Sequence, residues 1–196
     1  GVQHHIAMPI DIPPPEDLPS VADQLGHIKH PVAQEWAWER PFDIRHIDPA
    51  VWLLPSKELK NHQMIWLKTP SSFEASQSVH KAALAYASDY TLLEPILRQH
   101  GLHWIKPDMS SASLDHAMWW HRPVKVDEWL HYISHSPTAQ GARGLGLGHF
   151  FSRDGELVAS TGQEGMIRVP ESFLSKVKQF AQDTVIKTAW RKPRNR

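Results

Sequence analysis

The chain has 196 residues, no cysteine, and 21 basic against 21 acidic side chains. The lack of cysteine excludes disulfide frameworks, thiolate metal sites and cysteine-dependent enzymes, and the balanced charge argues against a general nucleic-acid binder. No stretch approaches the roughly 18 apolar residues of a membrane span, whereas a hydrophobic content of 41% suits a globular domain. We therefore expect one domain whose partners include neither nucleic acid nor a membrane.

Residues 1–40 are expected to form a linker or arm with one short helix. Five prolines stand between residues 9 and 19, and such a segment runs extended over a surface. Ser20 is a candidate N-cap for a short helix over Ser20–Ile28. The chain shows neither a basic start followed by an apolar run nor a C-terminal Ser-Lys-Leu, so the cytoplasm is the default location.

Two strands and one long helix are predicted next. Phe42–Ile47 alternates apolar and polar residues, and His62–Lys68 is a second strand candidate. Ser71 and Glu74 have capping-box spacing, which predicts that a helix begins there and continues through SVHKAALAYASDY. The small side chains of this run suit a helix closely wrapped by a sheet, and an ordinary core helix explains them nearly as well. Pro95 either opens a second short helical turn or kinks the first helix.

From residue 110 the pattern predicts four consecutive strands, in SASLDHAMWWHRP, WLHYISHSPTA, GARGLGLGHFFSRDG and ELVASTGQEGMIRV. Asp154-Gly155 is a hairpin signal between the last two. Gly144, Gly146 and Gly148 recur at period two, which makes a flat strip that suits a packed helix better than an acyl chain. One long helix followed by an antiparallel meander predicts an α+β domain over residues 41–170, followed by a helix and a basic tail over residues 171–196.

Three segments resemble the C-terminal half of the acyl-CoA thioesterase II family: AALAYASDY, SASLDHAMWWHRP and DEWLHYISHSPTAQGARGLGLGHFFSRDGELVASTGQEGMIR. The resemblance covers Pro41 to Val169 and implies a hotdog fold, in which an antiparallel sheet wraps a long helix. It also implies hydrolysis of fatty acyl-CoA to free acid and CoA, with no metal or redox cofactor. The family carries a first hotdog half upstream, and this chain begins in what resembles the linker after it. The resemblance thus implies pairing with another copy or with a separate hotdog half, unless the chain is a fragment.

The resemblance further implies a catalytic group of Asp89, Ser113 and Gln163 for direct attack by water. Asp89 lies near the C-terminal end of an apolar helix, where the helix dipole and partial burial are expected to raise its pKa and suit it as a general base. The hydroxyl of Ser113 can position a water, and the amide of Gln163 can orient it or hold developing charge. Taken without the resemblance, Asp89 caps the next turn, Ser113 bonds a neighbouring strand and Gln163 faces solvent.

Other residue patterns favour structural roles. Strand alternation is expected to place Ser113 and Asp115 on one face of a predicted strand and His116 on the other, so Asp115 and His116 are not expected to form a dyad. Trp119, Trp120 and Trp129 are expected to serve core or interface packing. No carboxylate cluster accompanies the spaced histidine pairs, so we expect no metal site; the pairs are His27 with His30 and His131 with His135.

Two other functions compete with thioester hydrolysis. One is a non-catalytic acyl-CoA-binding or assembly half that lacks its partner. The other is a hotdog hydratase acting on an enoyl-CoA, for which His80 and Asp89 are nine residues apart, an awkward spacing for one helix face. The basic end is expected to be a solvated tail rather than a site for CoA phosphates or nucleic acid; its residues are Lys187, Arg191, Lys192, Arg194 and Arg196.

Overall fold

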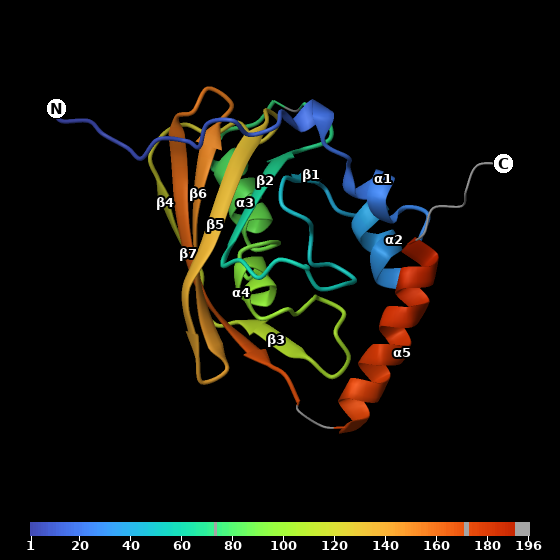
Figure 1. Cartoon of the computed structure of the whole chain (residues 1–196). Helices are drawn as coiled ribbons and strands as arrows, with labels where there is room; N and C mark the ends of the chain where they lie inside the picture. The colour runs from blue at the N-terminus through green and yellow to red at the C-terminus, as the bar shows by residue number, and fades with distance from the viewer. Residues whose placement is uncertain (73, 171–172, 191–196) are drawn as a thin grey trace.

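The computed structural model describes residues 1–72, 74–170 and 173–190. In this part of the chain, seven antiparallel strands form one sheet in the order β1-β2-β5-β6-β7-β3, and β4 also pairs with β7. The sheet curves around helix α3, as Figure 1 shows. The strands are β1 (Asp43–His46), β2 (His62–Lys68), β3 (Ser110–Ser113), β4 (Ala117–Trp120), β5 (Leu130–Gln140), β6 (Arg143–Ser152) and β7 (Leu157–Arg168).

The helices occupy two places relative to the sheet. Helices α3 and α4 lie in the hollow of the sheet, whereas α1, α2 and α5 pack together on the far side of the β1–β2 connection (Figure 1). Ile186 of α5 shares a buried cluster there with Leu25 and Ala33. The helical elements are η1 (Pro15–Asp17), α1 (Val21–Leu25), α2 (Pro31–Trp38), α3 (Gln77–Ser88), α4 (Glu94–Gln99) and α5 (Phe173–Trp190).

The main core fills the space between α3 and the inner face of the sheet. Leu84 and Ala87 of α3 are buried against apolar side chains of β2, β5 and β6. Within this cluster the rings of Tyr132 and Phe150 stack with their centres 3.8 Å apart. The alternating pattern of the sequence therefore yields one layer of sheet closed by one long helix, as predicted for an α+β domain.

Helix α3 begins later than Ser71 and Glu74 predict, so that prediction is wrong. Ser76 is the N-cap residue, and the first helical residue is Gln77. The Gln77 side chain donates to the carbonyl of Val124 and accepts from its N–H, both at 2.9 Å. These two hydrogen bonds fix the first turn of α3 to a distant part of the chain. By contrast, Ser20 caps α1 through a capping box with Asp23, as predicted for the cap residue, although α1 ends at Leu25.

The glycine strip of β6 is covered by the segment that leads into α4. A Cβ atom at Gly146 would lie 2.5 Å from the carbonyl oxygen of Leu92, and one at Gly144 would lie 2.6 Å from a methyl group of Ile96. Only glycine leaves room for backbone this close. The packing interpretation of the strip is therefore confirmed. Glu94 opens the short helix with Pro95 in its first turn, which confirms the first of the two alternatives for that proline.

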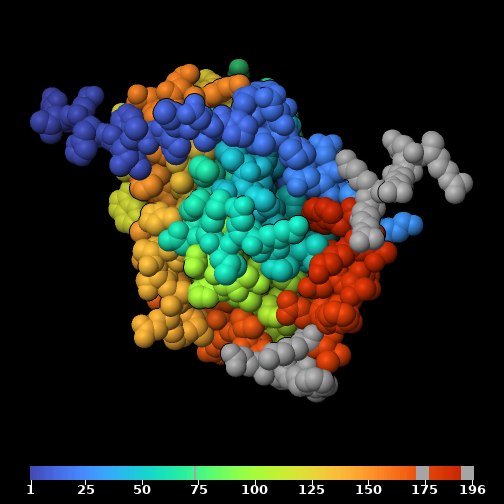
Figure 2. Space-filling view, viewed as in Figure 1, coloured from blue at the N-terminus to red at the C-terminus, as the bar shows by residue number. Residues whose placement is uncertain are grey.

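The proline-rich arm runs extended across the outer face of the sheet, as predicted (Figure 2). Trp66 of β2 donates its indole N–H to the carbonyl of Pro13 at 3.0 Å. Arg45 of β1 donates to the carbonyls of Pro15 and Leu18 at 2.9 and 3.0 Å. These bonds satisfy backbone groups that no strand partner reaches, so the arm is held at several points.

Helix α5 carries Lys187, whereas the other basic residues of the predicted tail lie outside the described residues; these are Arg191, Lys192, Arg194 and Arg196. Among the helices that the structure describes, none combines the length and apolar character needed to cross a bilayer.

A buried histidine makes the stability of this fold depend on pH. The imidazole of His131 is 0% exposed beside Trp66, and burial lowers its pKa from 6.5 to about 4. The unfolded chain therefore binds this proton below pH 6.5 and the folded chain only below about pH 4. We expect the free energy of unfolding to fall as pH drops through this interval, by about 1 kcal/mol per pH unit from this residue.

Urea unfolding between pH 6.5 and 4.5 measures this dependence, with His131→Phe compared with the unaltered chain. The variant keeps a ring beside Trp66 and is expected to show the smaller pH slope, while His4→Phe in the exposed part of the arm leaves the slope unchanged. Equal slopes for His131→Phe and the unaltered chain would contradict the assignment.

Candidate active site

The structure brings the three predicted residues into one hydrogen-bonded group. Asp89 is the C-cap residue of α3, and its Oδ1 accepts from the Ser113 hydroxyl at 3.1 Å and from Nε2 of Gln163 at 2.7 Å. Nε2 of Gln163 also donates to the Ser113 hydroxyl. Among the described residues, the carboxylate thus bonds across to β3 and β7 and not to the turn that follows it. Their catalytic roles stay a prediction.

The carboxylate of Asp89 keeps one oxygen available. Both of its side-chain partners contact Oδ1, and Oδ2 makes no hydrogen bond within the part of the chain that the structure describes. Asp89 and Ser113 are exposed, whereas Gln163 is 1% exposed and forms the floor of the group. The partial burial expected for Asp89 is therefore wrong, because the group opens at an edge of the sheet where, in the part of the chain that the structure describes, β3 and β4 have no outer neighbour.

A bulge aligns the group. The segment SASLDHAMWW, predicted as one strand, forms β3 and β4 with a break between them. Ser113 pairs with Gly165, and Ala117 pairs with Gly162, so residues 114–116 stand opposite only residues 163–164. The extra residue reverses the inside-to-outside alternation of side chains. Ser113 and His116 consequently both contact Gln163, which corrects the prediction that they face opposite sides.

His116, for which the sequence predicts a structural role, also belongs to this group. Its Nδ1 lies 2.9 Å from Oε1 of Gln163, and its Nε2 lies 2.9 Å from the hydroxyl of Ser88. Since the amide oxygen can only accept, Nδ1 carries the proton and donates it. This bond directs the amide NH₂ toward Asp89 and Ser113. Asp115, in contrast, accepts from the backbone N–H of Glu164 at 2.7 Å and holds the bulge.

Replacing His116 by Phe is expected to lower kcat about tenfold with little change in KM, because the Gln163 amide loses the bond that fixes its orientation. Steady-state turnover of an acyl-CoA, the substrate that the sequence resemblance implies, measures the effect, with a thermal melt to establish that the variant folds. His100→Phe at the exposed end of α4 is the matched control. Unchanged kcat in a folded His116→Phe would remove the positioning role.

The residues that a hydratase or a metal site would need do not come together in the same way. His80 is buried in α3, and its Nδ1 accepts from the backbone N–H of Val126 at 3.3 Å. Nine residues of helix separate it from Asp89, about 13 Å of rise. The hydratase pair is therefore not assembled. Within the described ranges, no three His, Cys, Asp or Glu side chains come together as a metal site.

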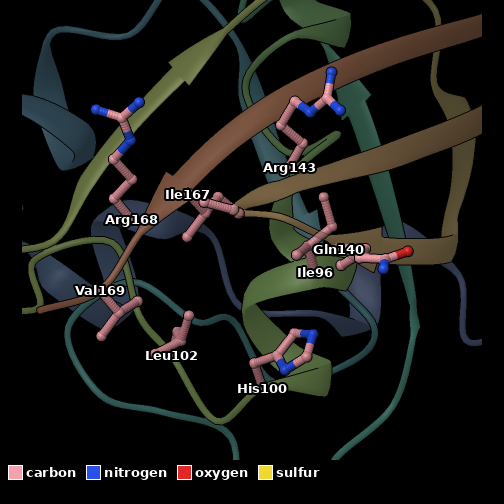
Figure 3. A pocket seen from close by; sticks show the side chains of 10 residues that line it. Ile96, His100, Leu102, Gln140, Arg143, Ile167, Arg168 and Val169 are labelled. Carbon is pink, nitrogen blue, oxygen red and sulfur yellow. The ribbon is translucent and has the colours of Figure 1, made fainter. Parts of the chain in front are cut away.

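A separate cavity of about 580 Å³ lies at the C-terminal end of β7, away from this group. Its walls include the apolar side chains of Ile96, Leu102 and Ile167, and Figure 3 shows the guanidinium groups of Arg143 and Arg168 directed away from them. Ile167 lies four residues along β7 from Gln163, about 13 Å in a strand. Leu93 packs on Gly165 between the two places. The cavity is therefore distinct from the Asp89 group.

Residues 37–166 match the model of a family described as acyl-CoA thioesterase. The chain is 33% identical over 180 residues to acyl-CoA thioesterase 2 of Haemophilus influenzae, covering 87% of this chain and 60% of that protein. The crystal structure of an acyl-CoA thioesterase II, TesB2, from Mycobacterium marinum superposes with a TM-score of 0.67 and 37% identity, over 87% of this chain and 59% of that one.

A conserved protein with a hot dog fold from Alicyclobacillus acidocaldarius superposes with a TM-score of 0.64 and 18% identity, over 87% of this chain and 58% of that one. This likeness concerns the fold, and it confirms the predicted hotdog architecture. In each of these comparisons the chain spans less than two thirds of the length of the other protein.

Proposed function

Because this chain belongs to the acyl-CoA thioesterase family, we propose that it hydrolyses fatty acyl-CoA to a free fatty acid and CoA. The observation that carries the proposal is the hydrogen-bonded group of Asp89, Ser113 and Gln163 at the exposed sheet edge. A carboxylate with one available oxygen, a hydroxyl and an oriented amide are the parts needed to hold a water for attack on a carbonyl.

In this mechanism the water binds between Oδ2 of Asp89 and the hydroxyl of Ser113. Asp89 takes a proton as the water oxygen attacks the thioester carbonyl, and negative charge develops on the carbonyl oxygen. The C–S bond then breaks, and the proton passes to the departing thiolate to give CoA and the free acid. No residue forms a covalent bond to the acyl group, and the chemistry requires no cofactor because CoA is part of the substrate.

We further propose that a second hotdog unit covers this edge, either in another chain or in another copy. Strands β3 and β4 are the outermost strands next to β7, and Leu114 and Trp119 at this edge are exposed. Val79 and Tyr86 on the outward face of α3 are exposed as well. An open strand edge beside apolar side chains favours pairing with another sheet. Such a cover would also remove Asp89 from bulk water.

The release of free CoA tests the function directly. The purified chain is incubated with short, medium and long acyl-CoA esters, and a thiol-reactive dye reports CoA without background because the chain has no cysteine. The same sample is sized in solution. Turnover by a dimer or larger assembly supports hydrolysis by paired units. Acyl-CoA binding without turnover, even after a first hotdog half from a relative is added, would instead favour the non-catalytic binding half.

A further inference from the structure

A cavity of about 550 Å³ lies between α1, α2, β1 and the start of β5. Cavities of this size hold small organic ligands. It lies next to the end of α3, since Tyr90, the residue after Asp89, packs against Phe42 in its wall. The cavity is separate from both the Asp89 group and the apolar cavity of Figure 3.

Two cations of this cavity have no carboxylate within ion-pair distance among the described residues, and the carboxylates of Glu35 and Glu94 act on Arg40 only from farther away. Asp43 is paired with Arg45 at 2.9 Å, and Glu16 is paired with Arg153 at 2.7 Å. The remaining cations are Arg40 and Lys68, whose side chains form no hydrogen bond or ion pair with the residues that the structure describes. The cavity therefore offers a net positive charge to an incoming ligand.

Aromatic rings hold these cations in place. The Arg40 guanidinium lies 4.3 Å from the ring centre of Tyr90 and 4.9 Å from that of Trp36. The Lys68 ammonium lies 5.2 Å from the ring centre of Trp129. Contact with a ring face positions a guanidinium and leaves its N–H groups at the rim to donate. Glu35 and Glu39 line a smaller cavity on another side of Arg40, whereas Trp36 lines the larger one. An anion is therefore expected to approach Arg40 from the Trp36 side, away from these two carboxylates.

One further tryptophan is available for stacking. Trp38 is 64% exposed at the rim of the cavity, an unusual exposure for so large an apolar ring. Two unpaired cations beside an exposed indole match a ligand that carries both phosphates and a flat heteroaromatic ring. A nucleotide has this combination.

We propose that this cavity binds the 3′-phosphorylated ADP end of CoA, with Arg40 and Lys68 on the phosphates and the adenine against Trp38. This inference rests on the proposed function, because that function supplies CoA as the ligand. The pantetheine arm of CoA separates the thioester from the phosphates, so the subsite must lie apart from Asp89 yet beside the same helix end. The Tyr90 contact with Arg40 gives it that position.

Calorimetric titration of the full chain tests the subsite without turnover. CoA is expected to bind to the unaltered chain, and Arg40→Gln and Lys68→Gln are each expected to weaken its binding about tenfold. Arg143→Gln removes an exposed arginine elsewhere on the sheet and is expected to leave CoA binding unchanged. Pantetheine, which lacks the nucleotide, is expected to bind all four chains equally. If both cavity variants bind CoA as tightly as the unaltered chain, the subsite is overturned.

Kinetics then separate this inference from the function on which it rests. Arg40→Gln is expected to raise KM for an acyl-CoA about tenfold and to leave KM for the matching acyl-pantetheine unchanged. An equal rise for both esters would overturn the nucleotide assignment. A chain that binds CoA through Arg40 but hydrolyses no ester would refute the proposed function and keep the subsite. Normal ester hydrolysis together with CoA binding that does not depend on Arg40 would support the proposed function and overturn the subsite.

Discussion

Asp89→Asn is expected to lower kcat for acyl-CoA hydrolysis about a thousandfold, in line with the contribution of a general base. The amide keeps the size of the carboxylate and can still accept from Ser113 and Gln163 through its oxygen. It can no longer take a proton from the attacking water. The loss is therefore expected in kcat, with KM for the acyl-CoA nearly unchanged.

CoA release measured with a thiol-reactive dye, together with a thermal melt, checks this result. Asp17→Asn in the exposed end of η1 removes the same charge without touching the group and is expected to keep full activity. A folded Asp89→Asn with turnover near that of the unaltered chain would exclude Asp89 as the base.

Arg98→Met is expected to reduce the free energy of unfolding by about 3 kcal/mol and the melting temperature by about 10 °C. Arg98 is 0% exposed, and its guanidinium donates to the carbonyl of Pro49 and to the side chains of Ser56 and Gln63. The nearby carboxylates of Asp48 and Glu94 are buried as well. Removing the cation leaves the Pro49, Ser56 and Gln63 acceptors without these donors, and the two carboxylates lose a nearby positive charge although they keep other hydrogen bonds.

Urea unfolding monitored by tryptophan fluorescence measures the loss. Arg143→Met, at a side chain that is mostly exposed, is expected to change stability by less than about 0.5 kcal/mol. If Arg98→Met unfolds at the same urea concentration as the unaltered chain, the buried carboxylates do not depend on this arginine.

The elements with a strong local pattern were predictable from the sequence. The bounds of β2 are those expected from its apolar run, and the Asp154-Gly155 turn joins β6 to β7 as predicted. The start of α3 was not predictable, because the Gln77 side chain that fixes it bonds to Val124, 47 residues away. The prediction of one short helix in residues 1–40 is wrong, because α2 follows α1 there; Pro31 at the first position of α2 is its local signal.

The candidate site was predictable only in part. The resemblance named Asp89, Ser113 and Gln163, and the structure places them within hydrogen-bond distance of one another. His116 was missed because strict strand alternation sent it to the opposite face from Ser113. The polar pair Asp115-His116, directly before the apolar AMWW segment, was the available signal of a break. In the bulge, three residues stand opposite two residues of β7. This pairing cannot be read from the sequence of one strand.

That mismatch has a consequence for how the site can vary. Leu114 lies in the bulge with an exposed side chain, so a substitution there is expected to leave the hydrogen bonds around Gln163 in place. The number of residues between Ser113 and Ala117 is not free. Removing one would return Ser113 and the residue before Ala117 to opposite faces and part the imidazole from the amide. At this place, the geometry of the Gln163 group depends on the number of residues in the bulge and not on the identity of Leu114.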